Sequence, residues 1–256
     1  MPQSTQSQNG STAQQVLAFA TNTWGINPTL EHLKHMVVRN SVIADLSSPD
    51  DRQLVQLSKL AGGEVIVFGL NDEEDLLPEL QYTAGNITFK PGSTSRDLPF
   101  DNDSVDVVTS FFATDYLMNM PMRGLFWEMS RILKPGGHAV LLMLHPRFVS
   151  GSWNLSFMRF SPESFENFWC SRVDEREDVR LDCHLTSTFG DIKRWQNAWH
   201  HTADNIKAAF TRTHLRLKDF IPLEMDAARA RKLYGDDSVG KMPTTPVYQI
   251  LVLRKY

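Results

Sequence analysis

Short apolar runs alternate with longer amphipathic stretches along most of this chain. The apolar runs predict buried strands at Ser41–Leu46, Glu64–Leu70, Asn86–Lys90, Val105–Phe111 and His138–Leu144. Between them, apolar residues recur three or four positions apart, which predicts helices at Asp50–Leu60, Asp72–Leu80 and Met122–Leu133. This alternation is typical of an α/β fold, in which helices cover both faces of a mostly parallel sheet.

The pattern changes after His145. Residues 146–198 are rich in aromatic side chains but show no regular alternation, so we interpret this stretch as a lid or pocket insertion. The polar residues 1–12 are expected to form a disordered tail. Residues 13–256 are then expected to form one domain.

Alternation resumes near the C-terminal end of the chain. The pattern predicts a helix at Thr202–Thr213, a strand at His214–Ile221, a short helix at Asp226–Leu233 and a final strand at Val247–Leu253. The short connection at residues 240–246, with its glycine, prolines and threonines, would allow the final strand to run antiparallel to its neighbour.

Composition narrows the classes of function. The chain has 256 residues, of which 41% are hydrophobic, and a formal net charge of −4, which is ordinary for a globular protein. Without a long basic run we expect no nucleic-acid partner. The apolar runs are far shorter than the roughly 20 residues that span a bilayer, so we expect no membrane partner. The absence of a secretion signal predicts a cytoplasmic protein.

Several stretches carry a family resemblance. They resemble stretches of class I S-adenosylmethionine-dependent methyltransferases, of the type 11 small-molecule kind. The stretches are RDLPFDNDSVDVVTSFFATDYL (Arg96–Leu117), MSRILKPGGHAVLLML (Met129–Leu144), HPRF (His145–Phe148) and, further on, WHHTADNIKAAF and LRLKDFIPLE. The resemblance implies a Rossmann-like, doubly wound, seven-stranded and mostly parallel sheet whose last strand is antiparallel. The glycines at positions 136 and 137 suit a tight turn that ends a helix before a buried strand.

The first cofactor motif departs from the family pattern. In this family, S-adenosylmethionine lies at the carboxyl ends of the strands, against a glycine-rich turn after the first strand. Asp45 aligns with the aspartate that opens this motif, but its three glycines are replaced by Ser47, Pro49 and Asp51. Serine and aspartate add side chains where the cofactor needs bare backbone, and proline removes an N–H donor.

The second and third cofactor motifs also differ from the family. Gly69 takes the place of the acidic residue that binds the ribose, which leaves Asn71 or Asp72 as a substitute. Ser93 replaces the aspartate of the third motif. These changes predict a degenerate cofactor site, so we expect no cofactor to be used. If S-adenosylmethionine is retained, Asp45, Ser47, Asn71 and Ser93 would hold it.

Candidate catalytic residues follow the predicted strands. His145 closes the fifth strand and is a candidate general acid or base, with Arg147 placed to bind an anionic substrate group. Asp115 and Tyr116 follow the fourth strand, where the first is a candidate catalytic group and the second a candidate substrate contact. A structural histidine and a helix-capping aspartate are the simpler readings.

Two adjacent histidines open the predicted helix near residue 202. His200 is a candidate catalytic residue, and His201 a candidate substrate contact together with Trp153 of the aromatic insertion. Adjacent residues of a helix point about 100° apart, so the pair cannot face one metal ion and we expect no metal site. Capping of the helix start is the simpler interpretation of both histidines.

Three functional hypotheses remain open. The first is a pseudo-methyltransferase or repurposed, cofactor-independent enzyme, such as a cyclase or isomerase, that binds a small apolar or aromatic ligand. The second is an active S-adenosylmethionine-dependent O- or N-methyltransferase with a divergent glycine loop. The third is a non-catalytic partner of an active paralogue, and a homodimer is an alternative assembly.

Overall fold

The computed structural model describes residues 25–46, 51–68, 86–90, 97–116, 119–145, 198–224 and 248–256, short stretches at 159–160, 179–181, 183–187 and 190–192, and the single residues 226, 228, 232 and 246. The expected tail at 1–12 and the predicted helix at Asp72–Leu80 lie outside these residues, as does most of the one predicted at Asp226–Leu233.

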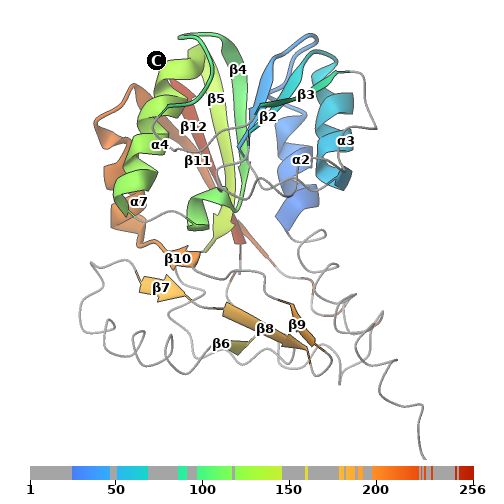
Figure 1. The fold of residues 1–256 in the computed structure, drawn as a ribbon, viewed down its shortest axis with the longest axis vertical. Coiled ribbons are helices and arrows are strands. Elements are labelled where there is room, and N and C mark those ends of the chain that lie inside the picture. The colour runs from blue at the N-terminus through green and yellow to red at the C-terminus, as the bar shows by residue number, and fades with distance from the viewer. Residues whose placement is uncertain are drawn as a thin grey trace, which may run out of the picture.

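A seven-stranded sheet runs through the described part of the chain (Figure 1). In spatial order its strands are β11 (Leu215–Leu223), β12 (Tyr248–Lys255), β5 (Leu133–Leu144), β4 (Val105–Phe111), β1 (Ile43–Asp45), β2 (Val65–Phe68) and β3 (Ile87–Lys90). Neighbours from β3 through to β5 are parallel, whereas β12 is antiparallel to both β5 and β11. The predicted fold class and the antiparallel last strand are confirmed.

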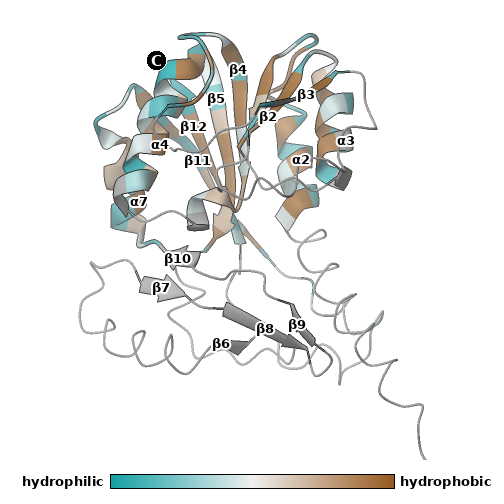
Figure 2. Ribbon diagram, viewed as in Figure 1, coloured by the Kyte–Doolittle hydropathy of each residue, from teal (hydrophilic) through white to brown (hydrophobic). Residues whose placement is uncertain are grey.

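Helices cover both faces of the sheet. On one side lie α2 (Asn27–Leu33) and α3 (Asp51–Ala61), and on the other α4 (Asn119–Ile132) and α7 (Ala203–Thr211) (Figure 1). The sequence pattern did not predict α2, a seven-residue helix with proline in its first turn. Hydrophobic residues concentrate on the central strands, and polar ones on the outer surfaces of the helices (Figure 2). None of the helices within the described residues is long and apolar enough to span a bilayer.

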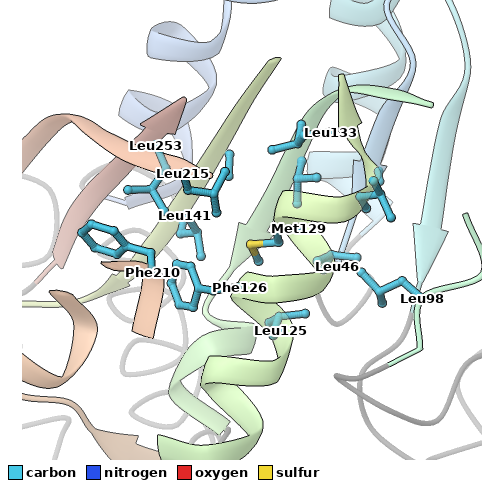
Figure 3. Packing of buried hydrophobic residues seen from close by; sticks show 14 of the residues in the cluster. Leu46, Leu98, Leu125, Phe126, Met129, Leu133, Leu141, Phe210, Leu215 and Leu253 are labelled. Carbon is cyan, nitrogen blue, oxygen red and sulfur yellow. The ribbon is translucent and has the colours of Figure 1, made fainter. Parts of the chain in front are cut away.

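The core between the sheet and α4 follows from helical spacing. Met122, Leu125, Phe126 and Met129 recur three or four residues apart, and all four are buried against the sheet. The ring of Phe126 meets that of Phe210 from α7, with 6.1 Å between centroids (Figure 3). This contact joins the two helices within one core cluster on this face of the sheet.

The two glycines of the predicted turn lie near the start of β5, and one of them has the positive φ expected of such a turn. Gly136 has a φ of +84°, which is costly for any residue with a side chain. A Cβ at Gly137 would lie 2.8 Å from the backbone oxygen of Asp106 on β4. Pairing with β4 already begins at Leu133, so β5 starts five residues before the predicted His138.

Arg131 of α4 clamps the segment that leads into β4. Its guanidinium donates to the backbone oxygens of Leu98 and Phe100 at 2.8 and 2.6 Å, and to Asn102 Oδ1 at 3.1 Å. It also donates twice to Glu128, which accepts a further hydrogen bond from the Leu98 N–H. The segment before β4 and helix α4 are therefore held together by hydrogen bonds of the Arg131 side chain.

Strand β11 forms one edge of the sheet. Leu217 and Phe220 are 51% and 39% exposed there. The pairing register with β12 shifts between Leu217 and Asp219, and the Phe220 N–H donates to the Asp219 carboxylate at 2.8 Å. Pro222, two residues further on, has no N–H to offer.

The segment after β5 contains short strands that the sequence pattern did not predict. β6 (Arg159–Phe160), β8 (Cys183–Ser187) and β9 (Gly190–Ile192) form one small sheet, and β7 (Val179–Leu181) pairs with β10 (Ala198–His200). Both lie below the carboxyl ends of the main strands in Figure 1. The location suits the lid predicted for residues 146–198, which remains a prediction.

Candidate functional site

The strand order reverses between β1 and β4, and the candidate site is built around this point. The chain winds outward from β1 through β2 to β3 on one side, and from β4 to β5 on the other. Helices therefore leave from opposite faces at neighbouring carboxyl ends, which opens a crevice where doubly wound sheets bind their ligands. Asp45, the last residue of β1, stands at this reversal point.

Asp45 is a buried carboxylate with an ordered position. It is 0% exposed, and its Oδ1 accepts a 2.7 Å hydrogen bond from the Thr109 hydroxyl of β4. The next residue, Leu46, donates its N–H to the Thr109 backbone oxygen at 2.8 Å. Thr109 therefore fixes both the side chain and the exit of β1, a role that sequence reasoning missed because a threonine inside an apolar strand carries no distinctive signal.

His145 lies at the end of β5, as predicted. It is 7% exposed, and its ring centroid lies 6.0 Å from that of Phe220 of β11, at an interplanar angle of 60°. The imidazole is thus positioned by packing at the carboxyl edge of the sheet, where a ligand in the crevice would meet it.

A short 3-10 helix, η4 (Ala113–Tyr116), follows β4 and carries Asp115 and Tyr116. Phe112, in the turn that leads into η4, has a positive φ of +66°. Its N–H donates a 2.7 Å hydrogen bond to the Leu142 backbone oxygen. Strained non-glycine residues of this kind concentrate at functional sites. The side chains of Asp115 and Tyr116 lie outside the described residues, although their backbone contacts β5 and β10 through η4.

The two histidines precede α7 instead of opening it. His200 ends β10, His201 follows, and Thr202 is the N-cap, whose hydroxyl accepts a bond from the Asn205 N–H at 3.2 Å. His201 is buried, with Nε2 3.1 Å from the Thr114 backbone oxygen of η4. This link brings the start of α7 to the end of β4, beside the same edge as His145.

No group of three or more potential metal ligands occurs within the part of the chain that the structure describes. Several predicted site residues lie outside that part: Ser47, Asn71 and Ser93 for the cofactor, and Arg147 and Trp153 for the substrate. The described elements nevertheless gather Asp45, Asp115, His145 and His200 at one edge of the sheet.

Gln249 is a second residue that sequence reasoning missed. It is 0% exposed on β12, directly opposite Met143 of β5. Its signal in the sequence is a single amide in the apolar run YQILVL.

Comparison with known proteins agrees with this geometry. Residues 45–141 match the family model described as a methyltransferase domain. This match supports the resemblance of the chain to class I S-adenosylmethionine-dependent methyltransferases. The matched region begins at Asp45, the last residue of β1, and ends in β5, so it contains the reversal point and the whole of β4.

Two curated methyltransferases share part of this sequence. The chain is 33% identical over 81 residues to phthiotriol/phenolphthiotriol dimycocerosates methyltransferase of Mycobacterium leprae, covering 32% of this chain and 26% of that protein. It is 39% identical over 92 residues to demethylmenaquinone methyltransferase of Staphylococcus carnosus, covering 34% of this chain and 36% of that protein. The similarity thus spans about a third or less of the length of these relatives.

Solved structures share the fold of this chain at low sequence identity. An S-adenosylmethionine-dependent methyltransferase from Mesorhizobium loti has a TM-score of 0.58 at 17% identity, covering 90% of this chain and all of that one. Geranyl diphosphate C-methyltransferase from Streptomyces coelicolor has a TM-score of 0.55 at 15% identity, covering 100% of this chain and 84% of that one. A Haloferax volcanii methyltransferase, solved in complex with the Trm112 activator, has a TM-score of 0.54 at 18% identity, covering 98% of this chain and 97% of that one.

These findings correct the expectation that no cofactor is used. The matched family model is a methyltransferase domain, the Mesorhizobium protein is S-adenosylmethionine-dependent, and the Streptomyces structure contains S-adenosyl-L-homocysteine. The expectation failed because it gave the substituted loop residues more weight than the retained Asp45 and the order of the surrounding motifs. Degeneracy of the cofactor site itself stays a prediction, since residues 47–50, 69 and 92–93 lie outside the described residues.

The described residues fit S-adenosylmethionine where they can be compared with its chemistry. The methionine part of the cofactor carries an ammonium group, and a buried carboxylate at the end of β1 matches such a cation. Asp45 has this position and this burial, and Thr109 orients it. Asp45 is therefore a group to which the ammonium of the cofactor could bind.

Proposed function

We propose that this protein is an S-adenosylmethionine-dependent methyltransferase that acts on an oxygen or nitrogen atom of a small molecule. The observation that carries the proposal is the fully buried carboxylate of Asp45, held by Thr109 at the point where the strand order reverses. A carboxylate at this place in a doubly wound sheet can bind a cationic group of a ligand in the crevice.

The chemistry divides between the cofactor and the chain. When bound, S-adenosylmethionine supplies a methyl group attached to a positively charged sulfur, which is reactive towards nucleophiles. His145, at the carboxyl end of β5, would accept the proton from the hydroxyl or amine of the substrate. Asp115 and His200, which the neighbouring η4 and β10 bring to the same edge, are the alternative proton acceptors.

Substrate binding would involve residues around these groups. Tyr116 and His201 belong to or contact η4, and Arg147 and Trp153 follow β5 in the sequence. The proteins named above act, by their names, on phthiotriol or phenolphthiotriol dimycocerosates, demethylmenaquinone and geranyl diphosphate. These names support a small-molecule substrate rather than a nucleic acid or a protein.

Cofactor binding tests the proposal directly. Isothermal titration calorimetry of the full chain with S-adenosylhomocysteine should give a dissociation constant in the micromolar range, about −8 kcal/mol of binding free energy. Asp45→Asn should weaken this binding by about tenfold to a hundredfold, which corresponds to about 1.4–2.8 kcal/mol for a lost charge-assisted contact.

Asp106→Asn is the matched control. Asp106 is also a strand carboxylate of the sheet, but it lies on β4 at the amino edge, where it accepts from the Val42 N–H and from Lys134. It should lower the thermal unfolding midpoint and leave the dissociation constant unchanged. If the wild-type chain binds no S-adenosylhomocysteine at about 1 mM, or if both variants bind like the wild type, the proposal is wrong. The first result would favour a non-catalytic protein.

A further inference from the structure

Gln249 presents an energetic problem that the fold alone does not solve. Its side chain is completely buried, and neither Nε2 nor Oε1 has a hydrogen-bond partner among the described residues. A primary amide has two donors and two acceptor sites, and burying such groups unpaired costs about 1–3 kcal/mol each. Leucine or methionine would fill the same position on an apolar strand without that cost.

The register of the sheet shows where this amide points. Gln249 lies opposite Met143, and Leu251 and Leu253 follow it at two-residue intervals on β12. Met143, Leu251 and Leu253 all belong to the core beneath α4 and α7, where Figure 3 labels Leu253. Because side chains two residues apart on a strand lie on the same face, the Gln249 side chain lies on this face as well.

Gln249 also lies close to the candidate site along the strand. Tyr248, the residue before it, pairs with Leu144, and Leu144 is followed by His145. The amide is therefore only one residue inside the carboxyl edge at which His145 stands. On the other side, Gln249 pairs with Pro222 of β11.

We propose that Gln249 is a specificity-determining residue of the methyl-acceptor pocket, where its carboxamide hydrogen-bonds a neutral hydroxyl or carbonyl group of the substrate. This inference rests on the proposed methyltransferase function, which supplies the reason for a pocket at this edge. A carboxamide carries no charge and offers both a donor and an acceptor, so it selects a neutral group that can do the same. The cost of burying the amide is then recovered when the substrate binds.

Binding of two matched probes tests the assignment without requiring turnover. 1-Naphthol and naphthalene share an apolar body and differ in one neutral hydroxyl group. The wild-type chain, titrated by calorimetry in the presence of S-adenosylhomocysteine, should bind 1-naphthol about tenfold more tightly than naphthalene, as expected for one satisfied hydrogen bond. In Gln249→Met, which preserves side-chain length, this preference should fall to about twofold or less.

Ser110→Ala is the matched control. Ser110 is also buried, with a hydroxyl that has no partner within the described part of the chain, but it pairs with Leu141, two residues deeper in the sheet than Met143. This variant should retain the preference for 1-naphthol. If Gln249→Met fails to fold, Gln249→Asn retains the amide but withdraws it by one methylene group, and it should lose the preference as well.

The outcomes separate the inference from the function on which it rests. An unchanged preference in a folded Gln249 variant overturns the inference, and so does a wild-type chain that binds neither probe or does not distinguish them. In the first case, a variant less stable than the wild type would indicate that the amide holds an internal water molecule instead. Failure of the wild-type chain to bind S-adenosylhomocysteine overturns the proposed function instead. This binding is measured in its own titration, independently of the ratio of the two probe affinities.

Discussion

Replacing Arg131 with lysine should destabilise the protein by about 3 kcal/mol. The guanidinium donates five hydrogen bonds, two of them to the backbone oxygens of Leu98 and Phe100 and two to Glu128. Hydrogen bonds to a charged group contribute about 1.5–3 kcal/mol each when shielded, but they are not additive, and this side chain is about a third exposed. Lysine keeps the charge but lacks the planar fork that reaches both oxygens at once.

Urea unfolding at neutral pH, followed by tryptophan fluorescence, measures this loss. The urea concentration at the unfolding midpoint should fall, and the slope of the unfolding free energy against urea concentration should stay unchanged. Arg212→Lys is the control, since Arg212 is exposed at the end of α7, and it should change the free energy of unfolding by less than about 0.5 kcal/mol. If Arg131→Lys is as stable as this control, the clamp does not stabilise the fold and the reasoning fails.

The pH dependence of unfolding gives an independent check of the same clamp. Burial raises the pKa of Glu128, but hydrogen bonds from Arg131 and the Leu98 N–H, with the charge of Arg131, outweigh it and bring the pKa below its ordinary value of 4.5. The ionised Glu128 therefore stabilises the folded state above about pH 4.5, and this stabilisation is lost as the pH falls below that value. In Arg131→Met this loss should be smaller, because the bonds that lower the pKa are gone.

Three further changes test other parts of the fold. Gly137→Ala should lower the free energy of unfolding by about 2–3 kcal/mol in urea titrations, because its Cβ would lie 2.8 Å from the Asp106 backbone oxygen; wild-type stability would contradict this. Thr202→Ala should cost about 1 kcal/mol through loss of the cap on the Asn205 N–H, with Thr202→Ser as the variant that should restore it. Burial, together with two nearby cations, lowers the pKa of His138 below 6.5, so stability should decline as the pH drops below that value; thermal melts of His138→Gln should show a weaker decline.

Periodicity predicted the elements whose apolar residues repeat without interruption. The runs at β4 and β2 and the spacing of Met122, Leu125 and Phe126 in α4 gave the correct element types. β4 has the predicted bounds, whereas the ends of β2 and α4 are displaced by one to three residues. The early start of β5 was missed because a glycine turn normally marks the end of pairing, whereas here Leu133 already pairs with Val105. The helix α2 was missed because its seven residues are too few to show a period.

The site was predictable only where a residue type is rare at a strand end. His145 and Asp45 stand out as polar residues that close apolar runs, and the structure places both at the carboxyl edge. Thr109 and Gln249 act within strands, where only three-dimensional pairing shows that one fixes a carboxylate and that the other lacks a partner among the described residues. The error about the cofactor came from reading substituted loop positions as a lost ligand, although a loop can bind through backbone groups that the residue type does not reveal.

The outer strand β11 has a consequence for how the protein behaves at high concentration. An edge strand with exposed apolar side chains is a template on which other molecules can grow into intermolecular sheets and, eventually, fibrils. Here the irregular register, the Asp219 carboxylate that occupies the Phe220 N–H, and Pro222 remove the regular row of donors that such growth requires. The open end of the sheet therefore carries its own protection against self-assembly, at the place where Leu217 and Phe220 would otherwise promote it.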